Sequence, residues 1–149
     1  MLLRTLGGLV LLLAACERPA GRQTAADSTP PVAQADTRTR AAKPDLIRLD
    51  QPLSGALITS PLAIAGEARG QWYFEASFPV YLLNAAGDTI VATPAQAEGE
   101  WMTSNFVPFK ATLTFTTPSA QHGTLILSKS NASGLPEHDD ELRVPIRFP

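Results

Sequence analysis

The sequence is poor in the residues on which most site chemistry depends. It has one cysteine, Cys16, and two histidines, His122 and His138, in 149 residues. A lone cysteine excludes an intramolecular disulfide, a CxxC redox pair and a multi-cysteine zinc site. Charged residues make up 17% of the chain and the net charge is −2, whereas nucleic-acid-binding domains are strongly basic. We therefore expect no nucleic-acid partner, and the length fits one domain with appendages.

Sequence motifs of catalysis and cofactor binding are also missing. No serine lies in a GxSxG sequence, and there is neither an HExxH motif nor a glycine-rich phosphate loop. Both histidines fall near predicted turns, where a solvated side chain is the ordinary outcome. We therefore predict a non-catalytic protein with no cofactor and no metal. An enzyme is the least favoured alternative, and it depends on whether His122 or His138 lies beside a serine or a carboxylate.

Residues 1–15 have the layout of a secretory signal peptide. Arg4 precedes an uncharged apolar run over residues 6–15, which is the order found in such signals. The run is too short for a membrane-spanning helix, which needs about 20 apolar residues. It ends in Leu13-Ala14-Ala15-Cys16, which resembles the lipobox of bacterial lipoproteins; a buried thiol in an N-terminal helix is the alternative.

The lipobox resemblance implies cleavage before Cys16, acylation of the Cys16 thiol and an extracytoplasmic protein anchored to a membrane. Several acyl chains hold a protein on a bilayer essentially permanently, because each buried CH₂ contributes about 0.8 kcal/mol. Glu17 is not the aspartate that resembles an inner-membrane retention signal. In a cell with two membranes, the outer membrane is therefore slightly favoured.

Residues 16–45 are predicted to be the lipidated cysteine and a disordered tether. The segment holds four prolines, and no aromatic residue precedes Trp72, so it offers little surface to bury. Its mixed charges nearly cancel, which is typical of a flexible spacer. A coil of this length reaches about 30 Å. A weak amphipathic helix is the alternative, but Pro30-Pro31 would interrupt it.

Residues 46–149 are predicted to form one all-β domain. All ten aromatic residues lie here, and apolar and polar side chains alternate with a period of two, as in half-buried strands. Pro145 lacks an N–H, so the last strand should lie at an edge or turn this residue away from its partner. Short strands without helical patterns indicate a two-sheet sandwich of about seven strands. Strands are expected near residues 47–49, 62–68, 73–77, 80–84, 89–95, 111–116, 123–128 and 142–148.

The expected core contains the large apolar side chains of these strands. A domain of this size can bury roughly two-thirds of its unfolded surface, so it needs no disulfide to fold. The predicted core residues are Leu62, Ile64, Trp72, Phe74, Val80, Leu82, Trp101, Phe109, Leu113, Phe115, Leu125, Leu127, Val144 and Ile146.

Several blocks of the domain resemble the immunoglobulin-like domain of bacterial spore germination, a Gmad-type domain, over residues 46–149. The resemblance implies an immunoglobulin-like sandwich found in extracytoplasmic, often lipid-anchored proteins, with no catalytic residues to carry over. Ala132 stands where a proline is expected in that pattern. The matching blocks are Ser60-Pro61-Leu62 with Gly66, 72–76, Phe78-Pro79-Val80, Gly99-Glu100-Trp101, 106–109, 129–137 and Val144-Pro145.

Five residues are candidates for a binding site: Trp72, Glu75, Trp101, Asn131 and Ser133. Glu75 follows three aromatics, and it either pairs with Arg69 or backbone N–H groups, or lines an aromatic groove with the two tryptophans. Asn131 and Ser133 precede the acidic run 137–141. Oxygen donors suit Ca²⁺, but the spacing matches no calcium loop, and a solvated acidic turn is the simpler interpretation.

The sequence thus predicts a lipid-anchored domain that docks partner proteins of the bacterial cell envelope, through its loops or by strand addition at a sheet edge. The alternative is a module that binds carbohydrate or peptidoglycan through exposed aromatics. Residues 46–149 carry ten acidic and six basic side chains, a balance that disfavours docking to anionic lipid.

Overall fold

The structure is a computed structural model, and it describes residues 39–149. The predicted signal peptide, Cys16 and the tether as far as residue 38 lie outside the described residues. Within residues 39–149, no helix is long and apolar enough to cross a membrane. The elements are β1 (Ala42–Lys43), β2 (Ile47–Gln51), β3 (Leu62–Arg69), η1 (Gly70–Trp72), β4 (Ser77–Asn84), β5 (Thr89–Ala97), β6 (Phe106–Leu113), β7 (His122–Ser128), η2 (Pro136–His138) and β8 (Glu141–Arg147).

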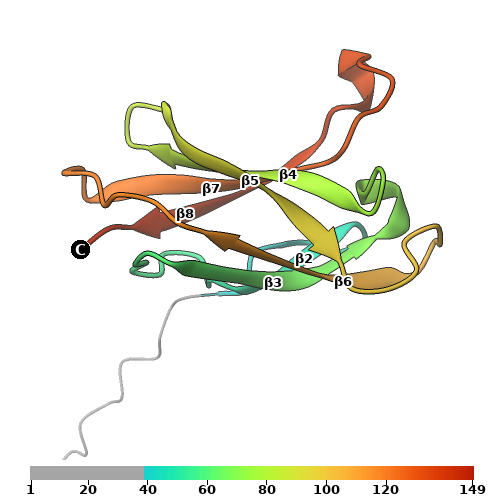
Figure 1. Cartoon of the computed structure of the whole chain (residues 1–149), viewed down its shortest axis with the longest axis horizontal. Helices are drawn as coiled ribbons and strands as arrows, with labels where there is room; N and C mark the ends of the chain where they lie inside the picture. The colour runs from blue at the N-terminus through green and yellow to red at the C-terminus, as the bar shows by residue number, and fades with distance from the viewer. Residues whose placement is uncertain (1–38) are drawn as a thin grey trace, which may run out of the picture. The chain divides into compact units, whose positions relative to one another are not determined.

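The strands form one antiparallel sheet that folds over into two layers. Its order is β1-β2-β3-β6-β5-β4-β7-β8. Strand β5 belongs to both layers, because it pairs with β4 over most of its length and with β6 only at Gln96 and Ala97. Figure 1 shows β5 passing from the layer of β4, β7 and β8 to the layer of β3 and β6. The predicted sandwich is confirmed, with eight strands in place of about seven.

Prolines lie on both outer strands of the β5-β4-β7-β8 layer, Pro94 on β5 and Pro145 on β8, and the segment of residues 55–58 is hydrogen-bonded along the outer side of β8. Pro94 is opposite Pro79, and a pair without N–H groups cannot be a hydrogen-bonded pair, so the backbone of Pro94 faces away from β4. The carbonyl of Pro145 accepts a 2.7 Å bond from the N–H of Gly55, outside β7. This confirms that Pro145 turns away from its partner strand. Edge prolines oppose the addition of a further strand.

The segment predicted as a strand at residues 73–77 is a turn instead. It follows η1, and Glu75 and Ala76 have φ angles of 50° and 59°, in the left-handed region. Regular strand residues have negative φ angles. Two successive positive φ angles usually occur at Asn-Gly or a similar pair, so the Glu-Ala sequence did not indicate this turn. The strand expected at residues 111–116 is also displaced, because β6 begins at Phe106 and ends at Leu113.

Two residues near the end of the predicted tether, Ala42 and Lys43, form β1 and are part of the sheet, and residues 44–45 belong to the turn that follows. Lys43 of β1 pairs with Ile47 of β2, and the N–H of Leu49 donates to the carbonyl of Ala41 at 2.9 Å. These backbone bonds do not depend on side-chain hydrophobicity, so the polar composition of the segment concealed them. The domain therefore begins several residues before position 46.

The core lies between the two layers and is centred on aromatic contacts. Phe78 packs edge-on against Phe109, with ring centroids 4.9 Å apart, and Tyr73 lies 5.3 Å from Phe78 on the other side. Of the predicted core residues, eleven are buried, and Trp101 and Phe115 are partly buried against the core. Phe74 was wrongly predicted: it is 48% exposed, because the turn after η1 directs it outward and places Phe78 inside.

Candidate functional site

A tight turn at Phe74–Ser77 projects two side chains from the start of β4. The N–H of Phe74 donates to the carbonyl of Ser77 at 3.0 Å, and the N–H of Ser77 donates back at 3.1 Å. With Glu75 and Ala76 both at positive φ, this arrangement corresponds to a type I′ turn, which normally carries Asn-Gly. Phe74 and Glu75 are both exposed as a result.

An open groove of about 380 Å³ lies beside this turn, on the outer face of β4 and β5. We call it the Phe74 groove. Most of its surface is apolar, and Glu75 is the one charged side chain among its lining residues. It is lined by Phe74, Glu75, Ser77, Phe78, Pro79, Tyr81, Ala92, Thr93, Pro94 and Ser130.

The alternation of the two strands explains the floor of the groove. Phe78 and Val80 of β4 point into the core, so Pro79 and Tyr81 between them face outward. The register places Pro79 beside Pro94 and Tyr81 beside Ala92. The sequence analysis missed these outward residues. Period-two alternation could have identified their face, but only the register brings the two prolines together.

The two tryptophans do not line this groove. Trp72 is completely buried, and its Nε1 has no hydrogen-bond partner, so it cannot stack on a ligand at the surface. Trp101 is partly buried and packs against the core. The predicted groove of Glu75 with the two tryptophans is therefore wrong; Glu75 lies instead with Phe74 and Tyr81.

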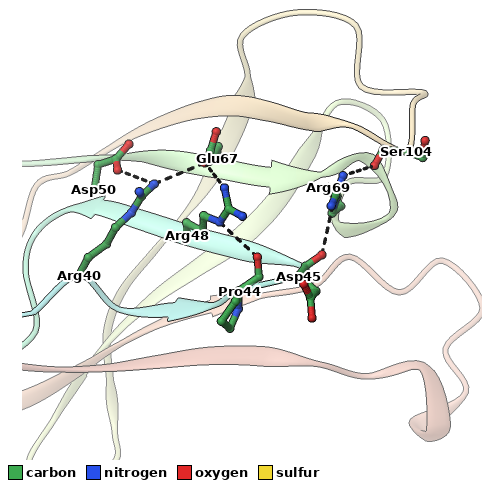
Figure 2. Close-up of polar contacts among 8 residues, drawn as sticks. All are labelled: Arg40, Pro44, Asp45, Arg48, Asp50, Glu67, Arg69 and Ser104. Carbon is green, nitrogen blue, oxygen red and sulfur yellow. Dashed lines mark hydrogen bonds and ion pairs between the residues drawn. The ribbon is translucent and has the colours of Figure 1, made fainter.

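Arg69 is engaged away from Glu75. Its guanidinium donates to the carbonyls of Asp45 at 3.2 Å and Ser104 at 3.0 Å, as Figure 2 shows. It also lies 4.1 Å from the ring centroid of Phe106, a cation–π geometry. The predicted pairing of Arg69 with Glu75 is absent from the described residues, and Arg69 instead fastens the ends of β1–β2 and β6.

A compact ion-pair network lies in the other layer of the sandwich, on β2, β3 and the residues next to β1. Arg40 lies 2.6 Å from Asp50 and 3.6 Å from Glu67, and Arg48 donates to Glu67 at 2.9 Å (Figure 2). Arg48 also lies 4.0 Å from the Phe106 centroid. The opposite charges are matched, and we assign this network to holding β1, β2 and β3 together. Exposed pairs of this kind contribute up to about 1 kcal/mol each.

Asn131 and Ser133 organise the loop between β7 and β8. The side-chain oxygen of Asn131 accepts the Ser133 N–H at 3.1 Å and the Gly134 N–H at 3.2 Å, and its amide donates to the carbonyl of Leu135 at 2.8 Å. Figure 1 shows this loop projecting from the sandwich. These bonds give Asn131 a structural role.

Ser133 and His138 meet in this loop, so the serine–histidine proximity on which the enzyme alternative depends is present. The Ser133 hydroxyl donates to Asn131 Oδ1 at 2.6 Å, and Ser133 Oγ lies 2.9 Å from His138 Nδ1. The tautomer of His138 decides whether Nδ1 donates or accepts in this contact. Ser133 and His138 are both exposed.

The acidic run after this loop is occupied by internal partners. Asp140 is paired with Lys43, Asp139 Oδ1 accepts the Asn131 amide at 2.8 Å, and Glu141 pairs with Arg143. Residues 39–149 contain no group of three or more histidine, cysteine, aspartate or glutamate side chains arranged to hold a metal ion.

The antiparallel sandwich is that of an immunoglobulin-like domain, a class that typically binds rather than catalyses. The family model described as "Immunoglobulin-like domain of bacterial spore germination" matches residues 46–134. That is more than half of the chain, and the chain belongs to this family. No curated protein and no solved structure matches the chain.

Tyr73 directly precedes the Phe74–Ser77 turn, and the burial of its side chain makes the stability of the domain depend on pH. Its hydroxyl donates to the Val107 carbonyl at 2.7 Å. Burial raises the pKa of Tyr73 above its ordinary value near 10. The folded state therefore resists ionisation: this contribution to stability is fully present below about pH 10 and is lost as the pH rises toward the higher folded-state pKa.

We expect Tyr73→Phe to lower the free energy of unfolding at pH 7 by about 1 kcal/mol, because one hydrogen bond is lost. Above about pH 10, the difference from the wild type should shrink. Urea unfolding at pH 7 and pH 10.5 measures both effects. A difference that grows with pH would contradict this account.

Proposed function

We propose that the protein is a lipid-anchored extracytoplasmic domain that docks partner proteins of the bacterial cell envelope without catalysis. The Phe74 groove is the observation that carries this proposal. Ligand sites are typically concave and mostly apolar, with a few placed polar groups. The groove has this composition, and Phe74 stands exposed at its rim.

The membrane anchor in this proposal rests on the sequence. Cys16 is the chain's one cysteine, and it ends the apolar run at the position of a lipobox. The predicted tether would hold the domain near the bilayer surface, where a partner in the envelope meets it at high effective concentration.

The Cys16→Ser variant tests the anchor. We expect the wild type to sediment with membranes and to require detergent for release, whereas the variant is recovered in the soluble fraction. The reason is that Cys16→Ser removes the thiol that carries the acyl chains. Fractionation followed by immunoblotting measures the effect. A wild type that is recovered as soluble protein would overturn the anchored localisation.

Cross-linking of the native protein in membranes, followed by capture in detergent, tests docking. A specific envelope protein should be recovered with the wild type and lost with the variant Tyr81→Ala, which changes the groove floor. The matched control is Arg143→Ala, which changes an exposed β8 residue outside the lining of the groove. Equal capture by all three proteins would overturn docking through the groove, and capture of wall glycan alone would favour the carbohydrate-binding alternative.

A further inference from the structure

We propose that the Phe74 groove receives an extended, proline-rich segment of the partner, with a lysine or arginine of that segment beside Glu75. This inference rests on the proposed docking function and names the chemistry of the docked segment. The charge of the groove, its aromatic lining with two engaged serine hydroxyls, and the strain at its rim support this occupant.

The charge of the groove selects a basic ligand. Glu75 is its one charged lining residue. Each ion pair between described residues joins other side chains, so the Glu75 carboxylate is not neutralised by any of them. A cation in the ligand complements this carboxylate, whereas an acidic ligand is repelled.

The hydrogen-bonding groups of the groove favour a polyproline II segment over a strand. The Ser77 hydroxyl donates to the Phe74 carbonyl at 3.3 Å, and the Ser130 hydroxyl donates to the Ser77 carbonyl at 2.9 Å. Among the hydroxyls that line the groove, those of Tyr81 and Thr93 are left, within the part of the chain that the structure describes, to bond a ligand, which suits the isolated carbonyls of such a segment better than the full ladder of a strand. A polyproline II segment keeps its backbone hydrated and docks through its side chains on aromatic-lined grooves. An added strand needs a free edge, and Pro94 removes a donor from the edge of β5.

Strain at the rim indicates that the carboxylate has a role. Glu75 and Ala76 occupy the left-handed region, which non-glycine residues adopt at an energetic cost, and such costs cluster at binding sites. An Asn-Gly pair would form the same turn with less strain. The chain instead keeps a carboxylate at the edge of an apolar groove.

Binding of two synthetic peptides to the full-length protein in detergent tests the inference. Both are fluorescein-labelled decapeptides of proline and leucine, one with a central arginine and the other with glutamate in its place, and fluorescence anisotropy gives Kd. The arginine peptide should bind more tightly. Glu75→Gln should weaken its binding about threefold, as expected for an exposed ion pair, and should reduce the preference for arginine over glutamate. Phe74→Ala should weaken both peptides about tenfold or more, because it removes an aromatic anchor.

Two further variants keep the result interpretable. Glu137→Gln neutralises an exposed carboxylate outside the groove and should leave both Kd values unchanged. The double variant Glu75→Asn with Ala76→Gly should raise Tm by about 5 °C and still lose the preference for arginine. This combination separates loss of the carboxylate from loss of folding.

Equal Kd values for the two peptides on the wild type would overturn the pairing of a basic ligand residue with Glu75. Binding that is unchanged in Phe74→Ala would show that the ligand binds outside the Phe74 groove. Failure of both peptides to bind, with cross-linked capture of a partner still lost in Tyr81→Ala, would overturn this inference and leave the proposed function standing. A synthetic peptide of residues 17–38, which contains Pro30-Pro31, is the competitor. If it displaces the arginine peptide and binds more tightly, the occupant is the chain's own N-terminal segment, which overturns docking of a partner segment.

Discussion

Phe78→Ala is expected to lower the free energy of unfolding by about 3–5 kcal/mol. Phe78 is 1% exposed and contacts both Tyr73 and Phe109 at the centre of the core. Truncation removes its buried surface and leaves a cavity that the two sheet layers cannot close, because β5 ties them together through its pairing with both β4 and β6. Urea unfolding followed by tryptophan fluorescence measures the loss.

Phe74→Ala is the matched control, since it makes the same chemical change four positions earlier. Phe74 is 48% exposed, so its truncation should cost less than about 1 kcal/mol. The pair of variants therefore separates the buried residue that holds the fold from the residue that stands exposed beside the groove. Equal losses in the two variants would show that the turn does not direct Phe74 outward.

Gly66→Ala is expected to lower the free energy of unfolding by about 3 kcal/mol, at the upper end of the usual cost of overpacking. Gly66 of β3 lies between Leu49 of β2 and Phe109 of β6. An added Cβ would lie 2.2 Å from the Arg48 carbonyl oxygen and 2.8 Å from the Phe109 ring. The carbonyl belongs to the backbone of a paired strand, so relief requires β2 to move.

Gly87→Ala is the control for this substitution. Gly87 has a φ of +92°, and an added Cβ would meet no atom within 4 Å. Its cost should be limited to about 1–2 kcal/mol of backbone strain. Thermal or urea unfolding of both variants decides the point, because a smaller loss for Gly66→Ala than for Gly87→Ala would refute the close approach of β2, β3 and β6.

The sequence predicted the sandwich because alternation is a direct consequence of burying one face of a strand. The last strand, β8, is an example: Val144 and Ile146 are buried and Arg143 is exposed, as expected. The position of Pro145 was also predictable, since a missing N–H restricts where a proline can sit. The alternation of buried and exposed residues and the missing proline N–H are both properties of a single strand, so they can be read from its sequence without knowing its neighbours.

The candidate site could be predicted only in part. The aromatic neighbours of Glu75 in the sequence identified it as a candidate. The residues that lie beside it in the groove were not identified, because their position depends on a turn that the Glu-Ala sequence does not indicate. Trp72 was assigned to binding as well as to the core, and its complete burial decides between the two. The groove itself depends on the register of β4 with β5, which one-dimensional patterns do not contain.

The short first strand has a mechanical consequence for a domain held by its N-terminal end. β1 pairs with β2 through two residues, whereas β2 and β3 pair along most of their length. Tension applied at residue 39 would therefore peel β1 away before it loads the rest of the sandwich. Release of the seven residues 39–45 frees about 24 Å of extended chain, at about 3.4 Å per residue, and the reach grows by that length less the distance the folded segment already spans. If the protein is anchored as proposed, β1 would serve as an extensible link between membrane and domain, separating under tension while the strands that carry the Phe74 groove stay paired.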